Sequence, residues 1–502
     1  MNFIKKYAVP LAAVSLIAIY LLIRLYNILG LPIFTDEAIY IRWSQIALND
    51  ASWRFISLTD GKQPMFVWIA LIIMRFIHDP LLAGRLVSVI AGFFSMIGLF
   101  FLGRELFKNK TIGLLSAFLY SIYPFALVYD RMALYDSLVG MFTIWGLYGT
   151  VLLARKIRLD IALILGMIIG AGMLTKTNAF ATLYLQPVAL LLIDLNKKHR
   201  KKILKWMLLL IPVALIAYAM YTILRLSPFF YIIDQKNAIF FYPLKEWLKH
   251  PFTFFSGNIS AMIDWFTKYM TYPFIILIIS SFFIVKDFLK EKILLIIWSI
   301  TPFIYLAFFG NNIYPRFILF MTLPLLPLLA YTIYQMKNKI LKKTILYALL
   351  IFLFIYPLRT DFLILTNFAA APIPQADKNQ YYSSWPSGVG VTETVNFLHQ
   401  ESKKQKIYVA TQGTFGLMPY ALEIYFQKNP NVEIAGFWPI NEKPPLQIIE
   451  KSQKMPTYVV FYQPCPSCVE TGIAPNSWPV KKIFQLEKQE KGQFYTLYKI
   501  EP

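Results

Sequence analysis

The chain has 502 residues, of which 57% are hydrophobic and only 15% are charged, whereas a soluble globular domain carries about 25% charged residues. This deficit, together with many long apolar runs, excludes a soluble globular protein and indicates a polytopic membrane protein. The 49 basic and 27 acidic side chains leave a net charge of +22. The basic residues cluster between the apolar runs, so we interpret them as cytoplasmic anchors rather than as a surface that binds nucleic acid.

The apolar runs predict about eleven transmembrane helices. Lys5 and Lys6 precede the first run, and no small-residue cleavage site of the A-x-A type follows it, so we interpret this run as a span. The predicted spans cover residues 8–28, 84–103, 112–129, 136–154, 160–175, 179–195, 204–226, 272–285, 293–309, 317–335 and 344–364.

The charge of the connections predicts which side of the membrane each one faces. Five connections that each contain at least three Lys or Arg residues are predicted to be cytoplasmic: 104–110, 155–158, 197–205, 286–292 and 337–343. The opposite connections carry acidic and aromatic residues instead. We therefore expect a protein of the plasma (inner) membrane with a cytoplasmic N-terminus and an extracytoplasmic C-terminal region.

Two outer loops are expected to contain segments that lie along the membrane surface. Residues 65–77 are apolar, but thirteen helical residues extend only about 20 Å, short of a hydrocarbon core of about 30 Å. We predict an interfacial or re-entrant helix there, within outer loop 30–83, with a short tilted span as the alternative. Residues 227–271 are rich in Phe, Tyr, Trp and Pro, which is typical of an aromatic belt, with the cover of a lipid-binding groove as the alternative.

Hydrophobic density falls after Thr366, which predicts a membrane domain over 1–365 and an extracytoplasmic soluble α/β domain over 366–502. Cys465 and Cys468 are the only cysteines, and outside the membrane we expect a local disulfide, with free or redox-active thiols as the alternative. Helices are expected over 392–404, 419–427 and 445–451, strands over 406–410, 432–435 and 456–462, and a final hairpin turn at 491–493.

The polar side chains that could perform chemistry all fall on the predicted outer face. Asp36 and Glu37 directly follow the first span, where a carboxylate could act as the general base of a transferase. A helix start with Thr35 as its N-cap explains the two acids equally well. Asp136 could form an ion pair with the arginine of its own loop. Four cations suit an anionic phosphate, with anchoring at the headgroup layer as the alternative: Lys62, Arg131, Lys176 and Arg316.

The order of these motifs resembles the membrane-bound GT-C glycosyltransferases. It is similar to the branch of the protein O-mannosyltransferases and the lipid A aminoarabinose transferase (glycosyltransferase family 39-like) over roughly residues 1–335. The motifs are Asp-Glu after the first span, Lys-x-Pro at 62–64, an Arg…Asp loop at 131–136 and a Leu-Thr-Lys turn at 174–176. The resemblance implies a polyprenyl-phosphate-linked sugar donor and an inverting transfer on the outer face to a protein, lipid or glycan acceptor.

The resemblance also implies roles for single residues. Asp36 matches the catalytic aspartate, the general base, with Glu37 and Tyr40 as its companions and Asp136 as the second-loop acid. Lys62 matches a lysine implied in phosphate binding, although the motif here reads Lys-Gln-Pro rather than Lys-Pro-Pro. Arg316 looks like the arginine that precedes a late span. Some GT-C enzymes hold a divalent metal at these acids, so a metal stays open, and no other cofactor is implied.

Two other classes of function compete with this interpretation. A polytopic lipid or polysaccharide transporter would more often contain internal repeats and charges in mid-span, which the sequence does not display. A membrane-anchored scaffold that presents the C-terminal domain would leave Asp36 without a purpose. The sequence specifies neither the sugar nor the acceptor.

Overall fold

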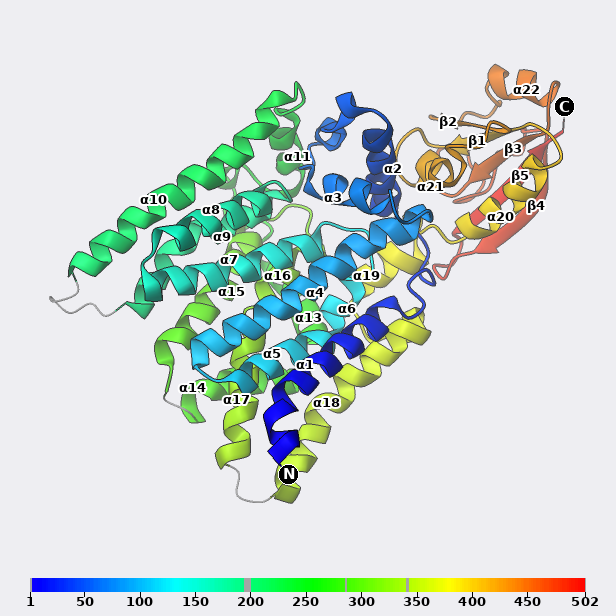
Figure 1. Ribbon diagram of the computed structural model, residues 1–502. Helices are drawn as coiled ribbons and strands as arrows, with labels where there is room; N and C mark the ends of the chain where they lie inside the picture. Colours follow the sequence, from blue (N-terminus) through cyan, green and yellow to red (C-terminus); the bar gives the residue numbers. More distant parts are fainter. Residues whose placement is uncertain (1, 194–199, 285–286, 340–342, 502) are drawn as a thin grey trace. The chain divides into compact units, whose positions relative to one another are not determined.

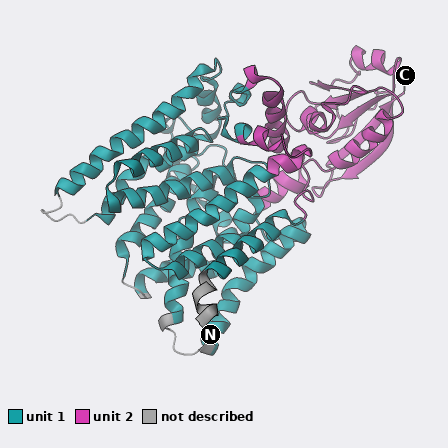
Figure 2. Ribbon diagram, in the orientation of Figure 1, with its two compact units in different colours: residues 1–26, 54–68, 86–374 teal, residues 27–53, 69–85, 375–502 magenta. Residues whose placement is uncertain are grey.

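The computed structural model describes residues 2–193, 200–284, 287–339 and 343–501. The predicted cytoplasmic connections 197–205, 286–292 and 337–343 therefore lie partly outside the described residues, as do the ends of the predicted spans 179–195 and 272–285. The chain forms two compact units (Figure 2). Unit 1 comprises residues 1–26, 54–68 and 86–374, and unit 2 comprises residues 27–53, 69–85 and 375–502.

Unit 1 is built from helices that follow one another with short connections (Figure 1). Two helices belong partly to unit 1 and partly to unit 2: α3 (Met65–Ile73) and α4 (Pro80–Phe107). The other helices of unit 1 are α1 (Asn2–Leu25), α5 (Lys110–Ser121), α6 (Pro124–Tyr129), α7 (Asp136–Lys156), α8 (Leu159–Met173), α9 (Phe180–Tyr184), α10 (Arg200–Thr222), α11 (Ile232–Phe240), α12 (Leu244–Trp247), α13 (Phe255–Met270), α14 (Tyr272–Ile284), α15 (Leu289–Phe309), α16 (Leu319–Thr322), α17 (Leu325–Lys339) and α18 (Lys343–Thr366).

Within the described ranges, 5 helices are long and apolar enough to cross a membrane, and the number rises to 7 if two bent pairs each count as one span. The pair Phe255–Met270 and Tyr272–Phe283 bends by 95°, and the pair Pro315–Thr322 and Leu325–Lys337 bends by 50°. The nine residues of α3 extend about 14 Å, which is too short to cross the hydrocarbon core.

Prolines divide two segments that the sequence predicts as single spans. The predicted span 112–129 ends its first helix at Ser121 and resumes at Pro124, which lacks the N–H that a continuous helix needs. The predicted span 179–195 becomes the short helix α9 followed by a 3₁₀ turn, η4 (Gln186–Leu192), that contains Pro187. A hydropathy pattern does not reveal such breaks, because the residues on both sides stay apolar.

A buried cluster of polar side chains fixes the loop that follows α6. The carboxylate of Asp130 accepts hydrogen bonds from the Arg24 guanidinium at 3.3 Å, from the Tyr120 hydroxyl at 3.1 Å and from the Ser137 hydroxyl at 2.8 Å. Arg24 also donates to the carbonyl of Ser121 at 2.5 Å. Arg24 and Asp130 are fully buried, so the pair compensates two charges that would each be costly alone.

The C-terminal part of unit 2 is a five-stranded sheet with helices on both faces. The strands are β1 (Ile407–Gln412), β2 (Val432–Phe437), β3 (Thr457–Phe461), β4 (Val480–Glu487) and β5 (Phe494–Ile500), in the order β2-β1-β3-β5-β4. The first three strands pair in parallel, and β5 pairs antiparallel with both β3 and β4. The helices are α19 (Gln375–Lys378), α20 (Val391–Ser402), α21 (Leu417–Phe426) and α22 (Leu446–Ser452).

Alternation along the strands explains the two covered faces. The side chain of Tyr408 on β1 lies on the sheet face that α22 covers, in the same apolar cluster as Ile448 of α22. Tyr458 on β3 points to the other face, where its ring packs on Phe397 of α20 at 5.3 Å. The strands and helices predicted from the sequence for residues 392–462 are all confirmed, and β4 and β5 form the predicted final hairpin.

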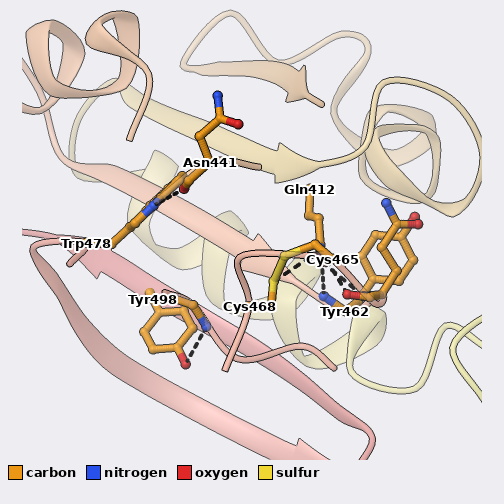
Figure 3. Close-up of a disulfide and its surroundings, with 9 residues drawn as sticks. Gln412, Asn441, Tyr462, Cys465, Cys468, Trp478 and Tyr498 are labelled. Atoms are coloured by element: carbon orange, nitrogen blue, oxygen red, sulfur yellow. Dashed lines mark hydrogen bonds between the residues drawn. A yellow bond between two sulfur atoms is a disulfide. The ribbon is translucent and has the colours of Figure 1, made fainter. Parts of the chain in front are cut away.

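The predicted disulfide between Cys465 and Cys468 is confirmed, and it closes the loop that follows β3 (Figure 3). The side chain of Gln412, the last residue of β1, is hydrogen-bonded to this loop. Its amide oxygen accepts from the backbone N–H of Tyr462 at 2.8 Å, and its amide nitrogen donates to the carbonyl of Gln463 at 2.8 Å. These bonds fix the loop against the sheet.

Candidate active site

Three of the four predicted phosphate-binding cations in unit 1 are connected by a group of aromatic rings. We call Phe240, Tyr314 and Phe317 the ring cluster. The Phe317 ring lies 5.7 Å from the Phe240 ring and 5.8 Å from the Tyr314 ring, measured between centroids. A cation lies over each ring, within the range of a cation–π interaction. The Nζ of Lys62 is 5.3 Å from the Phe240 centroid, the Nζ of Lys176 is 4.7 Å from that of Phe317, and the Cζ of Arg316 is 5.4 Å from that of Tyr314.

The Lys62 loop is held by its neighbours on both sides of the lysine. Gly61 ends the 3₁₀ turn η2 (Ile56–Asp60) with a φ of +66°, and a side chain there would meet the carbonyl oxygen of Ile232 at 2.7 Å. Asp60 is paired with Lys236 of α11 at 2.7 Å. These contacts fix the loop against α11, the helix that ends in Phe240.

Gln63, where the family motif has proline, connects the Lys62 loop to the Lys176 turn. Its side-chain amide donates to the hydroxyl of Thr177 at 2.8 Å, and the backbone N–H of Met65 donates to the carbonyl of Leu174 at 3.1 Å. Lys176 precedes the 3₁₀ turn η3 (Thr177–Ala179). The departure from the family pattern therefore supplies a hydrogen bond that brings two predicted cations to the same part of unit 1.

Asp136 pairs with Lys176 across this region. The Lys176 ammonium is 2.7 Å from the Asp136 carboxylate, which is almost fully buried at the N-terminus of α7. The N-terminal end of a helix is a favourable position for a carboxylate, and the contact with Asp136 orients the lysine. The sequence also allows an ion pair between Asp136 and Arg131, which stays a prediction. Arg131, in turn, donates from its Nη2 to the carbonyl of Tyr26 at 2.7 Å.

Arg316 is positioned by a short 3₁₀ turn, η7 (Pro315–Ile318), in which it is buried. The loop before this turn is tied to the end of α11. The backbone N–H of Asn311 donates to the carbonyl of Phe240 at 2.8 Å, and the side chain of Asn312 donates to the carbonyl of Ile239 at 2.9 Å. The guanidinium suits a phosphate group, because its planar donors can form two parallel hydrogen bonds with one anion.

The predicted acids Asp36 and Glu37 belong to unit 2, in the first turn of α2 (Thr35–Asn49). Glu37 is fully buried and forms a two-pronged ion pair with Arg85, in which both nitrogen–oxygen distances are 2.9 Å. Glu37 also accepts a hydrogen bond from the backbone N–H of Phe34 at 2.9 Å. Arg85 donates in addition to the carbonyl of Ile28 at 2.6 Å, so the pair fixes the loop that leads into α2.

Asp36 has a different environment from Glu37, because its side chain is half-buried. Tyr40, one turn later, is buried and packs its ring on Trp43 at 5.7 Å. The alternative interpretation of the two acids makes Thr35 the N-cap, but Thr35 is the first helical residue and Phe34 stands in the cap position. The Thr35 hydroxyl donates to the carbonyl of Pro386 at 2.8 Å, so it serves a long-range contact instead.

Sequence reasoning missed the residues that position the predicted ones. Arg85 lies within the predicted span 84–103. An arginine inside a span indicates that an acidic partner is buried with it. The same signal would have identified Arg24. The ring cluster gives no signal, because its aromatics resemble the many others of a membrane belt. Over the described ranges, no group of three or more His, Cys, Asp and Glu side chains is arranged to hold a metal ion.

Comparison with known proteins identifies the fold. Residues 61–221 match the family described as dolichyl-phosphate-mannose-protein mannosyltransferase. The crystal structure of ArnT from Cupriavidus metallidurans in the apo state matches 98% of this chain and 99% of its own, with a TM-score of 0.56 and 11% sequence identity. The chain has a GT-C glycosyltransferase fold. The predicted GT-C fold is thereby confirmed, and it makes this a multi-pass membrane protein. The family match supports the predicted resemblance, whereas the number of eleven spans is not confirmed.

Two further structures share the GT-C fold. ArnT from the same organism bound to undecaprenyl phosphate matches 98% of this chain and 99% of its own, with a TM-score of 0.55 and 12% identity. The apo oligosaccharyltransferase of Archaeoglobus fulgidus matches 92% of this chain and 70% of its own, with a TM-score of 0.50 and 14% identity. No curated protein sequence matches the chain.

Proposed function

We propose that this GT-C protein transfers a sugar from a polyprenyl-phosphate-linked donor to an acceptor hydroxyl on the outer face of the plasma membrane. The observation that carries the proposal is the set of three cations over the ring cluster, with Asp136 paired to Lys176. Three positive charges and one carboxylate leave these four side chains with a formal charge of +2, which complements a phosphate leaving group. A solved relative, ArnT, is described as bound to undecaprenyl phosphate.

In the proposed reaction the acceptor oxygen attacks the anomeric carbon of the sugar while the bond from that carbon to the phosphate oxygen breaks. The leaving group is the polyprenyl phosphate, and its growing negative charge is stabilised by Lys62, Lys176 and Arg316. A carboxylate takes the proton of the acceptor hydroxyl. A single displacement of this kind inverts the configuration at the anomeric carbon.

Asp36 is the proposed general base, and its environment supports that role better than the environment of Glu37. Glu37 is committed to Arg85 and to the backbone of Phe34, so protonation would break a buried ion pair. Asp36 is half-buried, so its carboxylate is more accessible to an acceptor than the fully buried Glu37. Arg131 is proposed as a further cation near the donor, and Tyr40 as a supporting residue in the packing of α2.

The base assignment is tested by sugar transfer from a radiolabelled polyprenyl-phosphate sugar in membranes. Asp36→Asn should lower transfer by about 10²-fold or more, since a general base contributes 10²–10⁴-fold. Asp50→Asn is the matched control, because Asp50 is an exposed aspartate at the other end of α2. Equal transfer by wild type and Asp36→Asn would exclude Asp36 as the base. Absence of transfer by wild type with any polyprenyl-phosphate sugar would refute the proposed function.

Donor binding tests the cations separately from the base. Lys62→Ala and Arg316→Ala should each weaken binding of the polyprenyl-phosphate donor by about tenfold, which corresponds to the ~1.4 kcal/mol expected for a charge-assisted hydrogen bond. Lys245→Ala, which changes an exposed lysine of α12, is the control. The measurement is donor titration of the purified protein in detergent. Unchanged affinity in both variants would refute phosphate binding at the ring cluster.

A further inference from the structure

The segment that leads into α20 lies against the start of the helix that carries Asp36. We call residues 381–388 the strap. Within unit 2, the carbonyl of Pro386 accepts hydrogen bonds from the backbone N–H of Thr35 at 3.1 Å and from its hydroxyl at 2.8 Å. The N–H of Gly388 donates to the carbonyl of Ile33 at 2.7 Å. The strap therefore contacts the residues immediately before Asp36.

Packing reinforces these hydrogen bonds. The ring of Tyr381 meets the ring of Phe34 edge-on at 4.9 Å, and Phe34 forms an isolated β-bridge with Ser387. Gly388 lies so close that an added side chain would stand 2.5 Å from the carbonyl oxygen of Ile33. The strap and the start of α2 are thus packed so closely that position 388 has no space for a side chain.

A single buried lysine holds the strap from the side of the sheet. Lys488 follows β4 and is 3% exposed. Its ammonium group donates to the carbonyls of Ser384 at 3.3 Å, Trp385 at 3.1 Å and Ser387 at 2.7 Å. A lysine ammonium has three N–H donors, so all three are used on the strap. The strap is also joined to the β4–β5 turn by the hydrogen bond from the Ser384 hydroxyl to Glu490.

We propose that Lys488 is a positioning residue for Asp36, which acts by holding the strap against the first turn of α2. The inference rests on the proposed role of Asp36 as general base. The path runs from Lys488 to the strap carbonyls, from Pro386 and Gly388 to residues 33–35, and from there to the adjacent carboxylate. The C-terminal domain is thus part of the catalytic machinery, although it supplies none of the proposed reacting groups.

The alternative is that Lys488 only stabilises the C-terminal domain. A positioning residue has a distinct signature, because a shift of about 1 Å at a reacting group can lower the rate by about 10²-fold without preventing folding. The donor-binding cations lie in unit 1 and are untouched by the change. Loss of positioning should therefore lower kcat and leave the KM for the donor within about twofold.

The test compares Lys488→Met with Lys491→Met, a control at an exposed lysine in the turn between β4 and β5. In full-length protein, hydrogen exchange followed by mass spectrometry should detect faster exchange at residues 30–40 and 381–388 in Lys488→Met alone. Transfer assays should detect a fall in kcat of about tenfold or more, with partial rescue in Lys488→Arg. Unchanged exchange at residues 30–40, or faster exchange with wild-type kcat, would overturn the proposal.

A second variant covers the case in which Lys488→Met fails to fold. Gly388→Ala forces the strap away from Ile33 and leaves Lys488 in place, so it should give the same fall in kcat. Gly257→Ala is its control, because nothing lies within 4 Å of the added carbon there. Wild-type kcat in Gly388→Ala would also overturn the proposal. If wild type transfers no sugar, the proposed function fails, while exchange still decides whether Lys488 fixes the start of α2.

Discussion

Asp36 and Glu37 are neighbours in the chain, yet the fold gives them different tasks. Glu37 is sealed in an ion pair with Arg85, and the pair ties the loop before α2 to the start of α4. Asp36, one position earlier, stays half-buried. A first helical turn sends successive side chains about 100° apart, so one acid points inward and its neighbour does not. The sequence predicts the pair but not this division, because Arg85 lies 48 residues away.

This division predicts that the two acids fail differently when mutated. Glu37→Gln leaves a buried arginine without its countercharge and should lower the free energy of unfolding by about 3–5 kcal/mol. Thermal unfolding in detergent measures the loss. Glu423→Gln is the control, since its ion pair with Arg42 is partly exposed and should contribute about 1 kcal/mol or less. Comparable losses in the two variants would contradict the structural role of Glu37.

At the scale of elements, the sequence predicts soluble secondary structure better than membrane spans. The strands β1, β2 and β3 alternate with helices, and runs such as Thr-Tyr-Val-Val-Phe at 457–461 consist of β-branched and aromatic residues, which favour a strand. Spans are defined by an apolar stretch alone, which a bend at a proline or a 3₁₀ turn does not interrupt. The cations of the site could be predicted, because charged residues are rare in this chain. The ring cluster that joins three of them could not, because aromatic residues occur throughout it.

The β4–β5 hairpin carries a pH dependence through Lys488. Burial lowers the pKa of Lys488 to about 7, whereas a lysine in an unfolded chain titrates near 10.4. Between these values the unfolded state binds more protons, so the stability of the C-terminal domain should rise with pH, by up to about 1.4 kcal/mol per pH unit. Below pH 7 both states are protonated and the dependence from this group vanishes. The neutral amine above pH 7 still has two N–H donors for the strap.

The dependence is measured by pulse proteolysis of the full-length protein in detergent between pH 7.5 and 9.5. Lys488→Met should remove the slope that this lysine contributes, and Lys491→Met should retain it. A wild-type slope identical to that of Lys488→Met would show that Lys488 titrates alike in the folded and unfolded chains. The comparison between variants isolates the lysine from tyrosines that titrate at higher pH.

For the whole molecule, the positive-inside pattern predicts the topology, and labelling can test it. Residue 110 lies in a connection predicted to be cytoplasmic, and residue 491 in the predicted extracytoplasmic domain. Both lysines are exposed, and the two native cysteines are joined in a disulfide, so an introduced cysteine is the sole target. An impermeant thiol reagent added to intact cells should label Lys491→Cys and spare Lys110→Cys. Labelling at position 110 would overturn the arrangement, including the interfacial assignment of 65–77.

Unit 2 has a consequence for how the protein is synthesised. Arg42 on α2 pairs with Glu423 on α21, 381 residues later in the chain. The hydrogen bond from Thr35 to Pro386 likewise needs a residue that is synthesised much later. At about 5–20 residues per second a ribosome needs roughly 20–80 s to cover that distance. During this time the nascent chain already carries the proposed base, but α2 lacks the partners that orient it. A premature stop codon between codons 375 and 386 would remove both partners and keep the described helices of unit 1, so it should yield an inactive protein.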